Sequence, residues 1–166
     1  DNTAAVFYLG AIVVGLDRSR PQLQQNITNT WANNRPHRAL LMLAALLHDV
    51  GQSVADTAGE KLAQARAESL RLSNDEKKRL SKIVRYSNLP LTIELTDLEM
   101  HRFWRKLGAA GVDVCLLALS GHLGTVGMEI DQDEWVTIIE RIQTLLDAYY
   151  VRYDEVVSPP SLVNGN

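Results

Sequence analysis

An adjacent histidine and aspartate, His48 and Asp49, follow a strongly apolar run at residues 39–47. Imidazole nitrogen and carboxylate oxygen bind divalent metal ions, and a metal with an open position lowers the pKa of bound water toward about 7. Such a water could attack phosphorus. Burial of this polar pair is costly unless a metal or hydrogen bonds satisfy it. The alternative to a metal site is a helix-end pair, in which Asp49 accepts backbone N–H bonds and His48 donates to a nearby carbonyl.

Basic side chains offer a second kind of chemistry. Three of them lie on one side of a predicted helix that also carries Trp104, and two precede the apolar run. Arginine beside an aromatic ring is typical of phosphate contact and base stacking. The alternative is a solvated helix face with the tryptophan in the core. The candidate RNA-binding residues are Arg35, Arg38, Arg102, Arg105 and Lys106.

Another basic run, Lys77-Lys78-Arg79 with Lys82, follows acidic Asp75 and Glu76. Mixed charge of this kind is typical of a solvent-facing helix. The run is therefore interpreted as ordinary surface charge.

The composition limits the classes of function. A chain of 166 residues with 46% hydrophobic and 22% charged residues is typical of one globular domain. The formal net charge of -3 excludes a global positive field, so any RNA binding requires a local basic patch. The single cysteine, Cys115, lies in an apolar run and is predicted to be a buried hydrophobe. With no possible intrachain disulfide and no visible export signal, a cytoplasmic location is expected.

The apolar run at residues 39–47 is too short for a membrane span, which needs about 20 residues, so no membrane partner is expected. Capping boxes begin helices at Ser73 and Thr96, and acidic residues from Asp131 begin another. No run of residues indicates a strand. The fold class is therefore all-α, a bundle of about seven or eight helices. The predicted helices are 3–17, 21–33, 36–50, 54–71, 74–87, 96–107, 110–123 and 132–153.

The stretch from Arg35 to Gly51 closely resembles the HD-domain segment of bacterial tRNA nucleotidyltransferases and poly(A) polymerases. Residues 153–165 resemble the linker that leads into the next helical region of that family. The resemblance implies an HD-like helical domain at 1–157 and the start of a linker at 158–166. The other segments that resemble the family, in the expected order, are 70–76, 83–85, 102–105 and 111–119.

The departures from the family lie at the metal site. Proteins of the HD type bind metal through an upstream histidine, the His-Asp pair and a distal aspartate. Leu9 and Gly121 occupy the first and last of these positions. His48 and Asp49 are therefore expected to be a vestigial metal site without a metal. His122 adjoins the lost aspartate, but one helical step turns a side chain by about 100°, so it is not expected to substitute.

The resemblance implies a larger parent enzyme, whose catalytic head would bind divalent metal and nucleotide. The chain has no glycine-rich turn followed by paired carboxylates, because Asp131 and Asp133 begin a helix. The fragment alone is therefore expected to be inactive and to need no cofactor. Its expected role is a noncatalytic spacer and RNA-contacting domain of a polynucleotide adenylyltransferase-like protein, with tRNA or another RNA as partner. The alternatives are a metal-dependent HD phosphohydrolase, which the lost ligands argue against, and a structural or protein-interaction module.

Overall fold

The computed structural model describes residues 16–48, 58–126 and 131–159. These residues form eight α-helices and no strand, which confirms the all-α prediction. A short 3-10 helix, η2 (Asp17–Ser19), precedes them, and a π-helical turn, η4 (Tyr153–Val157), follows them. The α-helices are α2 (Arg20–Thr28), α3 (His37–Leu47), α4 (Ala58–Ser69), α5 (Asn74–Arg85), α6 (Leu89–Thr92), α7 (Asp97–Leu107), α8 (Ala110–Val126) and α9 (Gln132–Tyr150). The predicted helix at 3–17 lies almost wholly outside the described residues.

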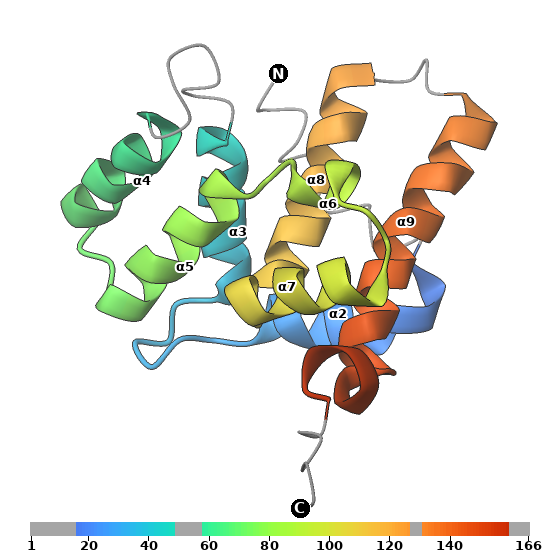
Figure 1. Ribbon diagram of the computed structural model, residues 1–166. Coiled ribbons are helices and arrows are strands. Elements are labelled where there is room, and N and C mark those ends of the chain that lie inside the picture. Colours follow the sequence, from blue (N-terminus) through green and yellow to red (C-terminus); the bar gives the residue numbers. More distant parts are fainter. Residues whose placement is uncertain (1–15, 49–57, 127–130, 160–166) are drawn as a thin grey trace, which may run out of the picture.

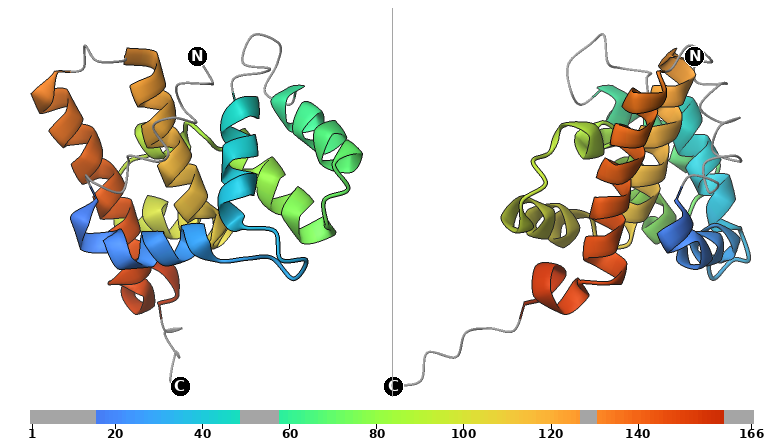
Figure 2. Two further views of the ribbon diagram at one scale, coloured as in Figure 1. Left: turned by 180° about the vertical axis from the view of Figure 1, so that it is seen from behind. Right: turned by 90° about the vertical axis from the view of Figure 1, so that its right-hand side faces the viewer.

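Helix α8 is the centre of the bundle. It runs beside α9 (Figure 1), and α7 and α2 lie on opposite sides of this pair (Figure 2). Residues 110–120 of α8 are all buried, including Cys115 as predicted. A helix that is apolar around its whole circumference is stable only when neighbours cover every face, and α3, α5, α6, α7 and α9 all contact α8.

The predicted helix starts are confirmed at α5 and α7. Ser73 and Glu76 form a reciprocal capping box, in which each side chain accepts from the backbone N–H of the other residue. The Thr96 hydroxyl accepts from the backbone N–H of Glu99. These contacts satisfy amide groups that the first helical turn otherwise leaves unpaired.

The helix predicted at 21–33 is wrong beyond Thr28. The chain leaves α2 there and turns back, with the N–H of Trp31 donating to the carbonyl of Arg35 over 2.8 Å. Asn34 adopts a φ of 62°, a conformation that asparagine tolerates better than most residues. The turn directs Trp31 toward His37, and the two rings stack with 4.4 Å between centroids.

Pro90 begins a helix rather than ending one. It lies in the first turn of α6, where proline lacks only an N–H that the helix would not use. The guanidinium of Arg141 on α9 donates to the carbonyls of Pro90 and Ile93, over 3.3 and 2.6 Å. This contact anchors α6 to α9, which the sequence pattern did not predict.

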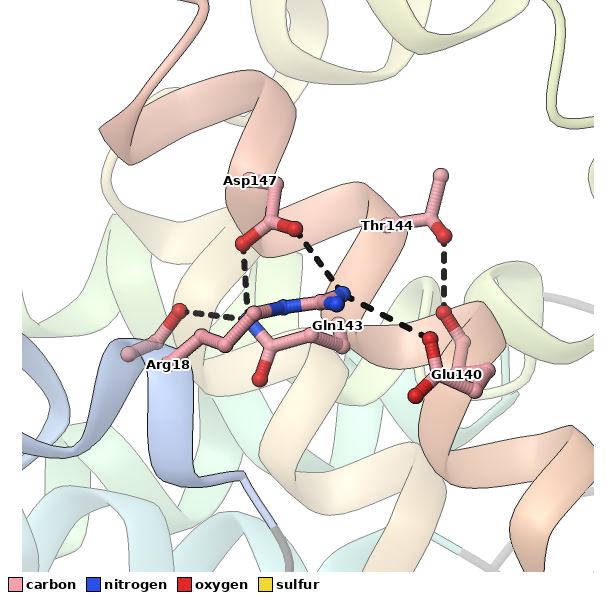
Figure 3. A network of polar contacts seen from close by, with 6 residues as sticks. Arg18, Glu140, Gln143, Thr144 and Asp147 are labelled. Carbon is pink, nitrogen blue, oxygen red and sulfur yellow. Dashed lines mark hydrogen bonds and ion pairs between the residues drawn. The ribbon is translucent and has the colours of Figure 1, made fainter.

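A polar network joins η2 to α9 (Figure 3). The Gln143 amide donates to the Ser19 hydroxyl over 2.7 Å and to Asp147 over 2.8 Å. Arg18 forms ion pairs with Asp147 and Glu140. Because Ser19 and Gln143 are buried, these bonds replace the hydration that both side chains lose.

No single helix in the described part of the chain is long and apolar enough to cross a membrane. Helices α7 and α8 meet the same criteria of length and composition only as a pair, and the two are bent by 109°.

Candidate functional site

His48 lies directly after α3, where its imidazole is buried. Its Nδ1 lies 2.8 Å from the carbonyl oxygen of Ala45. A carbonyl can only accept, so Nδ1 donates, as the helix-end interpretation predicts. In the neutral ring this assigns the lone pair to Nε2.

Nε2 of His48 faces Gly121 on α8. A Cβ built on Gly121 would lie 3.1 Å from this nitrogen. The tertiary structure thus brings together two positions that the sequence analysis assigned to one vestigial metal site. Asp49 and Leu9, the other two positions of that site, lie outside the described residues.

Residue 121 cannot supply a side-chain ligand beside His48, because it is a glycine. His122 Nε2 instead lies 3.1 Å from a carboxylate oxygen of Glu134 on α9. Among residues 16–48, 58–126 and 131–159, no three histidine, cysteine, aspartate or glutamate side chains lie close enough to share a metal ion.

The five predicted RNA-binding residues have different surroundings. Arg35 donates to Glu76 over 2.8 Å, and Glu76 is 0% exposed, so this arginine neutralises a buried carboxylate. Arg38 is exposed beside α2. Arg102 is paired with Glu99 one turn earlier on α7.

The interpretation that places the tryptophan of this helix in the core is confirmed. Trp104 is 1% exposed, its indole N–H donates to the carbonyl of Leu145, and its ring stacks on Tyr149. It is therefore a core residue that cannot stack on a base. Arg105 lines a cavity of about 380 Å³ with Tyr149 and Tyr153, separate from the cavity beside Lys106.

Lys106 instead belongs to a larger recess, here called the basic groove, with a volume of about 720 Å³. In Figure 1, α5 lies between α4 and α7, and the groove is lined by residues from all three helices together with Trp31. Six of its lining residues are basic and two are acidic. The basic residues are Lys77, Lys78, Arg79, Lys82, Arg85 and Lys106, and the acidic ones are Glu68 and Asp75.

The positive charges meet an aromatic ring at Tyr86. The Lys106 ammonium lies 5.0 Å from the centre of this half-buried ring, and the Arg85 guanidinium lies 5.4 Å from it. Lys82 donates to the backbone carbonyl of Lys106 over 3.0 Å, which joins α5 to the end of α7. Two helices distant in sequence thereby hold their cations around one ring.

Arg79 fixes the position of α5 beneath the groove. Its Nε donates to a carboxylate oxygen of Asp113 over 2.6 Å, and the side chain of Arg79 is only 12% exposed. Asn26 donates to the other oxygen of Asp113, so this buried carboxylate joins α2, α5 and α8. The interpretation of the Lys77–Lys82 run as ordinary surface charge is therefore wrong for Arg79.

Trp31 and His37 complete one side of this region. Burial and the nearby charge of Arg79 lower the pKa of His37, against the opposing effect of Asp113. The neutral form of His37 is therefore favoured beside Trp31. The indole N–H of Trp31 and Nη2 of Arg79 are buried without a hydrogen-bond partner in the described structure.

Most of the groove was not predicted from the sequence. A detectable signal was present, because residues 78, 81, 82 and 85 recur at three- and four-residue spacing on one face of α5, next to Tyr86. The contribution of Lys106 was not detectable in this way, since it depends on the packing of α7 against α5.

No family model matches the chain, and no curated protein matches it.

Proposed function

We propose that the chain is a noncatalytic, HD-like helical region of a polynucleotide adenylyltransferase-like or tRNA nucleotidyltransferase-like protein, and that it acts in RNA processing as a spacer that contacts RNA. The observation that supports contact with RNA is the basic groove. Two of its six basic side chains, Arg85 and Lys106, lie over the ring of Tyr86, although the whole chain has a formal net charge of -3. A local positive recess on an acidic protein attracts a polyanion at that place in particular.

The noncatalytic part of the proposal rests on the surroundings of His48. His48 donates to the carbonyl of Ala45, and residue 121, which its Nε2 faces, is a glycine. The nucleotide and divalent metal of the parent enzyme belong to a catalytic head outside this chain. A cytoplasmic location is part of the same proposal, because the only cysteine, Cys115, is buried and cannot pair within the chain.

The test is the binding of a fluorescently labelled tRNA to the wild-type chain and to the Lys82→Gln/Lys106→Gln variant at several salt concentrations. Each phosphate contact contributes about 0.7 to 0.9 to the slope of log affinity against log salt. Loss of two cations is therefore expected to reduce that slope by about 1.5. Thermal melting of each variant verifies that it remains folded.

The matched control is Arg102→Gln/Arg105→Gln, which removes the same charge outside the groove. We expect this variant to change the affinity and the salt dependence less than the groove variant does. If the groove variant binds tRNA with wild-type affinity and salt dependence, RNA contact at the groove is refuted and a structural or protein-interaction module becomes the better explanation.

A further inference from the structure

The shape of the basic groove limits the form of RNA that it can receive. A recess of about 720 Å³ has the size of a ligand pocket rather than of an extended surface. Proteins that hold double-stranded RNA contact its backbone over a long span, about 16 base pairs in one common module. The groove cations are confined to one recess between α4, α5 and the end of α7. An unpaired stretch matches these dimensions, because its bases can turn outward one at a time.

The aromatic ring of Tyr86 lines the groove beside two of its cations. Tyr86 is half-buried, so its ring is held by the core while part of it reaches the groove. The Lys106 ammonium and the Arg85 guanidinium lie over this ring, at 5.0 and 5.4 Å from its centre. Base stacking beside backbone-tracking cations is the usual arrangement in proteins that bind single strands.

The charge of the groove is also asymmetric. The α4 side contributes Gln64 and Glu68, both exposed, whereas all six basic residues, together with the acidic Asp75, come from α5 and α7. A carboxylate repels phosphate but accepts hydrogen bonds from the amino groups of bases, and a glutamine amide can pair with the edge of adenine. The side formed by α5 and α7 therefore suits phosphates, and the side formed by α4 suits the edges of bases.

From these three observations we infer that the basic groove binds an unpaired stretch of RNA, with a base stacked on Tyr86, phosphates on Lys82 and Lys106, and the base edge toward Gln64 and Glu68. This inference rests on the proposed function and specifies its ligand. It requires that single strands bind better than duplexes and that the preference depends on the ring at position 86.

The experiment compares a single-stranded oligoadenylate of about ten nucleotides, a hairpin duplex of similar charge, and adenosine monophosphate. Binding is measured by fluorescence anisotropy, with competition for the mononucleotide. We expect the single strand to bind more tightly than the duplex. Tyr86→Leu is expected to weaken single-strand binding by about 5-fold to 100-fold, while Tyr86→Phe retains it, because phenylalanine preserves stacking.

A second pair of variants tests the base side. Gln64 and Glu68 are exposed on α4, so Gln64→Ala and Glu68→Gln should leave the melting temperature unchanged. We expect Gln64→Ala to reduce the preference for oligoadenylate over oligouridylate. An unchanged preference in both variants would refute the assignment of the base edge to α4.

The outcomes distinguish this inference from the proposed function. If Lys82→Gln/Lys106→Gln weakens binding but the duplex binds as tightly as the single strand, RNA contact stands and the single-strand inference fails. It also fails if Tyr86→Leu and Tyr86→Phe bind alike, or if the mononucleotide competes as well as the oligonucleotide. If no RNA responds to the loss of the two lysines, both proposals fail.

Discussion

His48 and Gly121 face each other across the contact between α3 and α8, with Nε2 of His48 3.1 Å from the position of a Cβ on residue 121. The donation from Nδ1 to the carbonyl of Ala45 holds the ring in this orientation. A histidine fixed in this way by a backbone carbonyl is a common feature of metal-binding imidazoles. The absence of a carboxylate at residue 121 therefore has a testable consequence.

Restoring that carboxylate should increase metal affinity. In Gly121→Asp, an acidic side chain would lie beside the lone pair of His48, and we expect the affinity for Mn²⁺ or Zn²⁺ to rise by about tenfold or more. Isothermal titration calorimetry measures the change. Gly121→Asn is the matched control without charge, and adding His48→Ala should abolish the gain. Equal affinity in the wild-type and Gly121→Asp proteins would contradict the shared site.

The buried pair of Arg79 and Asp113 should be essential for stability. In Asp113→Ala the guanidinium, 12% exposed, would lose its counter-charge, and we expect the free energy of unfolding to fall by about 3 to 5 kcal/mol. The control is Asp97→Ala, which breaks the pair with Arg152 at a side chain that is 65% exposed and should cost less than about 1 kcal/mol. Urea denaturation gives both values. Similar losses in the two variants would show that burial does not determine how much an ion pair contributes to the free energy of unfolding.

A side chain at residue 111, where α8 begins after α7, should destabilise the fold. A Cβ there would lie 2.5 Å from Cζ3 of Trp104, whose ring is held by Tyr149 and by the bond to Leu145. We expect Gly111→Ala to lower the free energy of unfolding by about 1 to 3 kcal/mol, through overpacking. Near-ultraviolet circular dichroism and thermal melting measure the effect. A stable variant with an unchanged tryptophan signal would contradict this packing.

The stability should depend on pH through Glu76. Burial alone would raise the pKa of this carboxyl, but bonds from the backbone and side chain of Ser73, the charge of Arg35 and a bond from Asn33 together lower it from the ordinary value of 4.5. Because the folded-state pKa is the lower one, the stabilisation is fully present above about pH 4.5 and is lost as the pH falls through the lowered pKa.

The comparison that isolates this effect is wild type against Glu76→Gln, with urea denaturation between about pH 7 and pH 3. Near pH 7 we expect the variant to be less stable by about 1.5 to 3 kcal/mol, because it loses charge-assisted bonds. The difference should shrink as the pH falls below 4.5. A difference that stays constant with pH would show that the charge of Glu76 does not stabilise the fold.

Several features were encoded locally and could be predicted. The Ser73–Glu76 capping box spans four residues, and the burial of Cys115 follows from its apolar surroundings. The end of α4 was less predictable. Arg71 adopts a φ of 52° there, and the N–H of Leu72 bonds to the carbonyl of Ala67, a termination usually formed with glycine. The sequence has no glycine at this position that would have predicted the end of α4.

Some features of the candidate site also follow from local sequence, whereas others depend on the packing of helices. The sequence by itself determined an all-helical fold class, a polar residue at the end of an apolar helix, and a run of mixed charge on α5, because caps and periodicity act over three or four residues. Only the tertiary structure decided that His48 meets Gly121, that Trp104 is buried, and that Lys82 bonds to the carbonyl of Lys106 while the Lys106 ammonium lies over Tyr86. These relationships depend on how whole helices pack, since residues far apart in the chain become neighbours only when their helices exclude water between them.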